Sequence, residues 1–537
     1  MIKIEKEGIP EECVLEIGHQ VREAEVGICH GISDRSGTHI LALLQRLLEW
    51  SSQTVSVTRL RAPRHVSIVL SLACLALVGG SNGHTSDDVR TQSKHPVVRQ
   101  AFARWASPTL DSLDALSIET LRQRNYAADI KIQQSLVPKI ATDGQQRYFV
   151  SYLSDGLQVY VRVDVPSTEA PIGGYPSVVF VHGWVGEQAA PTYDFELNNA
   201  SAAAAVIEAY VNAGFVVLTP GLRGHGTISG RAAGGLEFLH TWDNRSYLSP
   251  MFYAIDVLNL IAGLESLEYL DWQAWGREPR LDRARINIVG YSQGGDVALT
   301  ALAIAGANST LKTSIHAASI WAGCFASRLE QASIYGPMQD TAMAFTAGDG
   351  RWNGSASAAD GRRNADFVFA FPSDWIVNPS PANWTWQAEN WQLPTVEASL
   401  RKTYSEMYAH YRAGIADIGD IQYNLARNEQ GSLEVFHAAG LEEQLKRLGG
   451  YHAPQYLTEP INLHHSDRDF YSPADWNADL AERVNAAGGK VYDFVYPGTN
   501  HQLAVSSQDW FSPAGTVDGL AKMLERDIML FSREEAR

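Results

Sequence analysis

The residues best suited to chemistry lie in the segment Gly290-Tyr291-Ser292-Gln293-Gly294, where a serine stands between two glycines. The apolar run 286–289 precedes this segment, and the helix-forming run 296–302 follows it. A sharp turn from a strand into a helix exposes a serine hydroxyl, and the strained backbone admits only small residues two positions before and after that serine. The pattern therefore predicts that Ser292 is a nucleophile on a strand-to-helix elbow.

A serine hydroxyl is a weak nucleophile, so it needs an imidazole as base and a carboxylate to orient that imidazole. His501 is chosen from the 16 histidines because it follows the last predicted strand, 491–496. Asp469 is chosen as the acid because it lies on the loop after a short apolar strand that begins at 461. Asp467, on the same loop, is the rival for this role.

The pair His464-His465 with Asp467 also suggests a metal site. Neighbouring residues at a strand end point to opposite faces of a sheet, so these side chains should not converge on one ion. We therefore expect no metal and no cofactor.

Acyl transfer also needs backbone N–H groups aimed at the oxygen that becomes negatively charged. The amide of Gln293 is one expected donor, since it follows the nucleophile. The second should come from the loop after an earlier strand, 178–181, where His182-Gly183-Trp184 offers the amide of Trp184.

Together with a predicted hairpin at 148–159 and the stretch Arg223-Gly224-His225-Gly226, these segments resemble the α/β-hydrolases. The resemblance spans Gln145 to Phe531. It is to the secreted branch, which is similar to prolyl oligopeptidase-like enzymes and dienelactone hydrolase-like esterases. It implies an α/β fold with a mostly parallel central sheet and helices on both faces, and it gives catalytic roles to Ser292, Asp469 and His501. Dienelactone hydrolases proper use cysteine, so this chain is closer to the serine members.

The expected activity is hydrolysis of a carboxylic ester, from a small molecule or a polymer, through an acyl-enzyme. A serine peptidase or amidase of the prolyl oligopeptidase-like type is the alternative, because the same triad cleaves amides. A binding protein built on a hydrolase scaffold is a more remote alternative, which an intact triad disfavours.

The length of 537 residues leaves room for more than the hydrolase core. We expect the core in two parts, 145–324 and 456–537, with a helical N-terminal extension at 81–144. The intervening segment, 325–455, is far longer than an ordinary loop and is predicted to be a large, mainly helical cap. Its tryptophans are candidates for the wall of the substrate pocket, with cap core as their alternative place: Trp375, Trp384, Trp386 and Trp391.

The formal net charge of −17 and a pI near 5.4 argue against nucleic acid or an anionic membrane surface as a partner, because both would repel the chain. Three of the 4 cysteines lie before residue 75, which leaves Cys324 in the enzyme region. No disulfide framework is expected there, and Cys324 is predicted to be a small buried residue.

A basic stretch at 59–64 precedes an apolar run at 66–80, after which the chain turns polar. This order is typical of an export signal, with cleavage near Gly80, and the run is too short for a stable membrane span. We expect a secreted or periplasmic protein; lipid attachment at Cys74 is the less favoured alternative. Residues 1–58 are a leader or reflect a misassigned start, since initiation at Val55 or Val57 would place the signal at the N-terminus.

Overall fold

The computed structural model describes residues 109–133, 139–140, 144–197, 202–270, 278–339, 394–427, 429, 433–466, 469, 471–496, 501–503 and 519–533. Several sequence-based predictions fall outside these residues. They are the leader at 1–58, the signal at 59–80, most of the extension before residue 109, Asp467, and Trp375, Trp384, Trp386 and Trp391.

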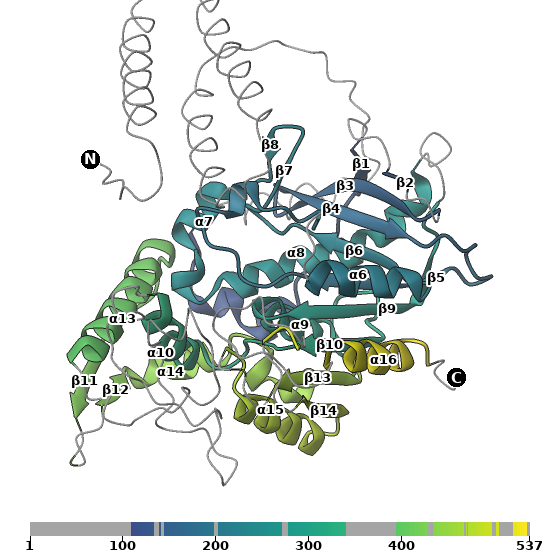
Figure 1. Ribbon diagram of the computed structural model, residues 1–537. Helices are drawn as coiled ribbons and strands as arrows, with labels where there is room; N and C mark the ends of the chain where they lie inside the picture. The colour runs from purple at the N-terminus through teal and green to yellow at the C-terminus, as the bar shows by residue number, and fades with distance from the viewer. Residues whose placement is uncertain are drawn as a thin grey trace, which may run out of the picture. The chain divides into compact units, whose positions relative to one another are not determined.

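A sheet of 10 strands forms the centre of the described structure (Figure 1). Its order is β1-β3-β4-β6-β5-β9-β10-β13-β14, and β2 pairs with β3 beside this path. The strands are β1 (Lys131–Ile132), β2 (Lys139–Ile140), β3 (Gln146–Ser154), β4 (Leu157–Val165), β5 (Tyr175–Val181), β6 (Val216–Pro220), β9 (Leu281–Tyr291), β10 (Ala317–Trp321), β13 (Ile461–Ser466) and β14 (Val491–Tyr496).

From β6 to β14 every neighbouring pair of strands is parallel, whereas β1 to β4 and the β4–β6 pair are antiparallel. A crossover places β6 between β4 and β5, and the later strands follow chain order. This is the strand order of the α/β-hydrolase fold, so the expected fold class is confirmed.

Helices cover both faces of the sheet, as the alternation of its buried residues shows. Val178 and Phe180 of β5 pack in a cluster with α6 (Ala202–Asn212) and α16 (Gly519–Phe531). Val179 and Val181 pack in the other cluster, with α8 (Ser249–Gly263), α9 (Gln293–Ala305) and α15 (Ala474–Ala486). Strands buried on both faces are mostly apolar, and β5, β6 and β10 are buried along their whole length with one serine or threonine each, Ser177, Thr219 and Ser319.

The segment Ser249–Tyr269 joins α8 to a 3-10 helix, η5 (Leu264–Tyr269). By length and composition this segment could cross a membrane, but 83% of its most apolar 18-residue stretch is buried inside the molecule. Its apolar character is accounted for by its place in the core.

The expected helical extension at 81–144 needs a correction. Two short helices, η2 (Leu113–Leu116) and α5 (Ile118–Arg122), are present, but β1 and β2 follow them and both pair with β3. The sheet therefore begins before the predicted boundary at 145. Each of these strands has only two residues, too few to show the alternation of apolar and polar residues that predicts a strand.

The segment expected to form the cap, 325–455, has three α-helices and a hairpin among its described residues. Its helices are α10 (Arg328–Gln339), α13 (Pro394–Gly414) and α14 (Ala439–Lys446), and β11 (Tyr423–Arg427) pairs with β12 (Leu433–His437). These elements lie together at the left of Figure 1. One face of α13 is apolar and buried, at Leu400, Tyr404, Tyr408 and Tyr411.

The remaining described elements are short connections. They are η3 (Ala190–Thr192), β7 (Thr227–Ile228), β8 (Arg231–Ala232), α7 (Leu236–Thr241), η4 (Asn244–Ser246), η8 (Gly450–His452) and η9 (Pro454–Tyr456).

Candidate active site

Ser292 lies at the sharp turn between β9 and α9, with φ 55° and ψ −122°. A positive φ is uncommon for a residue with a side chain and indicates a strained turn. The flanking glycines are required by space: a Cβ on Gly290 would lie 2.1 Å from the carbonyl oxygen of Gly294, and a Cβ on Gly294 would lie 2.3 Å from that of Val181. The predicted elbow is therefore present.

Hydrogen bonds from the neighbouring strand hold this strained turn in place. The amide of Ser292 donates to the carbonyl oxygen of Trp321 at 3.0 Å, and the amide of Cys324 donates to that of Ser292 at 2.9 Å. The rings of Tyr291 and Trp321 also lie 4.1 Å apart. The end of β10 and the residues after it thus fix the backbone on both sides of Ser292.

The predicted contact between His501 and Asp469 is present. Nδ1 of His501 donates to Oδ2 of Asp469 at 2.7 Å, and both residues are buried. The other carboxylate oxygen, Oδ1, accepts from the amides of Tyr471 at 2.9 Å and Ser472 at 3.2 Å. Because a carboxylate oxygen only accepts, the proton is on Nδ1, and Nε2 of His501 is the nitrogen that can act as a base.

His501 lies beside the elbow. Its ring is 5.3 Å from that of Tyr291, the residue before the nucleophile, and 4.8 Å from that of Tyr471. The fold thus brings the turns after β9, β13 and β14 together at the carboxyl ends of parallel strands, where sites in α/β proteins form.

The alternative metal site at His464-His465 is not formed by the described residues. His464 bonds to Asp527 at 2.9 Å and to the hydroxyl of Tyr496 at 2.7 Å. His465 bonds instead to Asp493 at 2.7 Å. The two imidazoles bond to different carboxylates, and the described part of the chain contains no group of three or more His, Cys, Asp or Glu side chains that could hold a metal ion.

The expected oxyanion loop lies against the nucleophile. A Cβ on Gly183 would be 3.0 Å from the Cβ of Ser292, so a larger residue here would crowd Ser292. Trp184 follows, with 53% of its side chain surface exposed. Gln293 is the first residue of α9, a position whose amide has no partner within its helix.

Two buried histidines, His182 and His225, lie close together where this loop begins. Nδ1 and Nε2 of His182 face the carbonyl oxygens of Gly183, at 2.8 Å, and Gly221, at 3.2 Å. The His225 ring lies 5.2 Å away. Burial lowers the pKa of His182, and burial together with the nearby His182 lowers the pKa of His225 to about 3.

We expect the protein to lose stability as the pH falls below 6.5. There the unfolded chain protonates His182 and His225, whose ordinary pKa is 6.5, while the folded chain keeps them neutral. The unfolded state then binds more protons, so the free energy of unfolding falls by up to about 1.4 kcal/mol per pH unit for each such histidine. Denaturant titrations between pH 4 and pH 8 measure this slope. His225→Gln should make it shallower, and an unchanged slope would contradict the assignment.

Cys324 is a site residue whose position was missed. It is buried, as predicted, but its Sγ lies 3.5 Å from Oγ of Ser292. Burial raises the pKa of its thiol to about 12. The thiolate is the reactive form of cysteine, so burial makes this thiol less reactive than an exposed one. Its sequence surroundings, Ala322-Gly323 before it, carried no signal of this contact.

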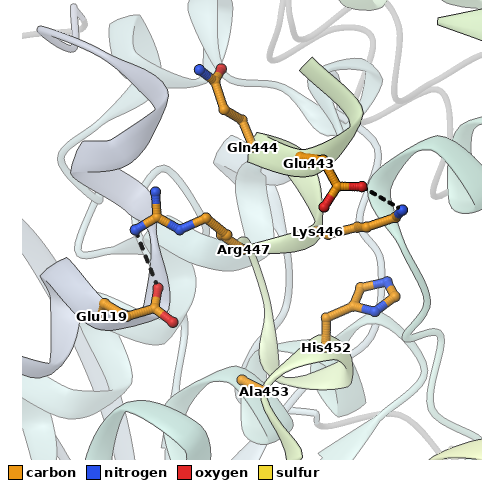
Figure 2. A pocket seen from close by; sticks show the side chains of 7 residues that line it. All are labelled: Glu119, Glu443, Gln444, Lys446, Arg447, His452 and Ala453. Atoms are coloured by element: carbon orange, nitrogen blue, oxygen red, sulfur yellow. Dashed lines mark hydrogen bonds and ion pairs between the residues drawn. The ribbon is translucent and has the colours of Figure 1, made fainter. Parts of the chain in front are cut away.

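A hollow of about 490 Å³ lies between α5, α14 and η8 (Figure 2). Its charged side chains pair with one another: Lys446 with Glu443 at 2.9 Å, and Arg447 with Glu119 at 3.5 Å. Ser292, Asp469 and His501 do not line it. Its charges balance one another.

No protein-family model matches the chain, and no curated protein matches it. Among solved structures, it is similar to acetyl xylan esterase 1 from Thermoanaerobacterium sp. JW/SL YS485, with 13% identity and a TM-score of 0.40, over 82% of this chain and 99% of that one. It is similar to Est1E from Butyrivibrio proteoclasticus, with 12% identity and a TM-score of 0.34, over 71% and 98%. It is also similar to Pyrococcus horikoshii acylaminoacyl peptidase, with 16% identity and a TM-score of 0.36, over 73% of this chain and 43% of that one.

Similarities this remote decide neither activity nor substrate; the strand order and the elbow are features of this chain itself. The strand order and the elbow give this chain the α/β-hydrolase fold. With the buried Asp469–His501 pair beside the elbow, the site has the architecture of a serine hydrolase.

Proposed function

We propose that the chain is an exported serine hydrolase that cleaves a carboxylic ester through an acyl-enzyme. The observation that carries this proposal is the buried bond between Asp469 and His501 beside the strained turn of Ser292. A strained serine turn and a tautomer-fixed imidazole are the two features that nucleophilic catalysis by serine requires.

In the first half of the reaction, Oγ of Ser292 attacks the ester carbonyl carbon while Nε2 of His501 takes the hydroxyl proton. The carbonyl oxygen becomes an oxyanion, which the amides of Gln293 and Trp184 stabilise. Asp469 stabilises the positively charged imidazole through Nδ1. His501 then gives the proton to the leaving alcohol oxygen, the ester C–O bond breaks, and an acyl-serine remains.

In the second half, water takes the place of the alcohol. Nε2 of His501 accepts a proton from this water as its oxygen attacks the acyl carbon. The second oxyanion collapses, the bond to Oγ of Ser292 breaks, and the proton returns to Oγ. The products are a carboxylic acid and a regenerated serine.

We favour an ester over an amide because an alkoxide is a better leaving group than an amide anion, so ester cleavage depends less on protonation of the leaving group by the general acid. Steady-state rates with p-nitrophenyl esters of rising chain length, beside aminoacyl p-nitroanilides, decide between the two. We expect kcat/KM for the best ester to exceed that for every anilide. A higher kcat/KM for an anilide would move the proposal to a peptidase or amidase.

A fluorophosphonate label followed by peptide mass spectrometry tests the nucleophile independently of substrate choice. The label should be attached to Ser292. A chain that hydrolyses none of these substrates and takes up no label would favour the binding-protein alternative.

We also propose that residues 59–80 direct export and are removed. Expression in a bacterial host should give an exported chain whose N-terminus, measured by mass spectrometry, lies near Ser81. A version that begins near Ser81 should be soluble and fully active, because every proposed triad residue lies after it. A mature N-terminus at Cys74 carrying lipid would indicate anchoring, and loss of folding on truncation would show that the leader is structural.

A further inference from the structure

Asn244, the first residue of η4, touches both segments that supply the expected oxyanion donors. It is 6% exposed, and its Oδ1 accepts from Nε2 of Gln293 at 2.8 Å. Gln293 follows the nucleophile, and its amide is the first expected donor. This bond holds the Gln293 side chain against η4.

The other contacts of Asn244 reach the loop that contains Trp184. Its Nδ2 donates to the carbonyl oxygen of Val185 at 3.1 Å, and its backbone amide donates to Oε1 of Glu187 at 3.1 Å. Val185 is the residue after Trp184, whose amide is the second expected donor. The loop is therefore tied to η4 directly beyond that donor.

The hydrogen-bond partners fix the orientation of the Asn244 amide. A carbonyl oxygen, such as that of Val185, only accepts, so the amide group facing it must be the NH2 of Asn244. The oxygen then faces two donors, Nε2 of Gln293 and the hydroxyl of Ser249, the latter at 2.9 Å. All three side-chain bonds are satisfied in this orientation alone.

We propose that Asn244 is a positioning residue that sets the separation of the two oxyanion donors by bonding to both of their segments. This inference rests on the proposed function. Donors placed in advance around the developing charge stabilise the transition state and not the bound ester. A displacement of about 1 Å can cost about 100-fold in rate. The bonds from Asn244 to Gln293 and Val185 form a clamp, and losing this clamp should therefore lower kcat and leave KM nearly unchanged.

The test compares Asn244→Leu, which keeps the approximate shape and removes the bonds, with the unaltered enzyme. We expect kcat to fall by about 10- to 100-fold, with KM changed by less than about twofold. A boronic acid that forms a tetrahedral adduct on Ser292 places an oxygen in the oxyanion site. Its inhibition constant should rise by a factor similar to the fall in kcat.

Gln293→Leu is a second variant, which breaks the same clamp from its other side. Because both changes remove one unit, the double variant should lose little more than the worse single variant. Asn259→Leu is the matched control: Asn259 is a fully buried asparagine on α8 that bonds to Ser154 and to the amide of Ala127. It should lower the melting temperature without weakening boronate binding.

Two results would overturn the clamp while leaving the hydrolase proposal intact. One is an active wild-type enzyme whose Asn244→Leu variant keeps its kcat and its boronate affinity. The other is an Asn244→Leu variant that loses as much melting temperature as Asn259→Leu and no more activity than it. Failure of the hydrolase proposal would show separately, as a wild-type chain that neither hydrolyses esters nor accepts the fluorophosphonate label.

Discussion

Ser292→Ala and His501→Ala should each lower kcat by about 10⁴-fold or more and leave the fold in place. Each change removes one member of a unit that works only when complete, so either loss disables the nucleophile. The residual rate comes from substrate binding and the oxyanion donors. Ester hydrolysis by the purified variants measures kcat, and circular dichroism with thermal unfolding checks the fold.

Ser309→Ala is the matched control for the serine variant. Ser309 lies just beyond the C-terminal end of α9, where its hydroxyl donates to the carbonyl oxygen of Ala305 at 2.9 Å. Ser309→Ala removes a serine hydroxyl near the opposite end of the same helix, so this variant should keep near-normal turnover. Near-normal turnover by Ser292→Ala itself would end the serine-hydrolase proposal.

The elbow and the strands around it were predictable because their requirements are local. A serine at φ 55° between packed backbones needs glycine at 290 and 294, and those glycines are visible in the sequence. The predicted last strand, 491–496, coincides with β14. The buried runs of the parallel strands are continuous, so they are recognisable without any knowledge of their neighbours.

Features that depend on tertiary contacts were not predictable in this way. The strands β1 and β2 exist because β3 offers them an edge to pair with. Cys324 lies next to Ser292 because β9 and β10 are neighbours, and Asn244 reaches Gln293 across 49 residues. Such contacts join residues that no local period connects.

The same holds for the packing behind the catalytic loops. Asp527 of α16 bonds to His464 of β13 at 2.9 Å and to Ser319 of β10 at 2.7 Å. His464 in turn bonds to Tyr496, the last residue of β14. One buried carboxylate thus fastens the strands that lead to Asp469 and His501. Charged side chains are seldom fully buried unless paired, and these partners account for the burial of Asp527.

The second large effect is expected for Asp469→Asn, which should lower kcat by about 10⁴-fold. An asparagine oxygen would keep the place of Oδ1, because the amides of Tyr471 and Ser472 point at it. The new NH2 group would then face Nδ1 of His501, where Oδ2 now accepts at 2.7 Å. A donor there requires an unprotonated Nδ1, so the proton moves to Nε2 and the imidazole can no longer accept the proton of Ser292.

Asp467→Asn is the comparison that makes this prediction decisive, because Asp467 was the rival for the same role. It should retain most of its turnover in the ester assay, with Asp469→Asn measured alongside. The Asp469 variant should also take up the fluorophosphonate label far more slowly, since labelling needs the same activated serine. The reverse ranking of the two variants would assign the acid to Asp467 and leave the buried Asp469–His501 bond without a catalytic role.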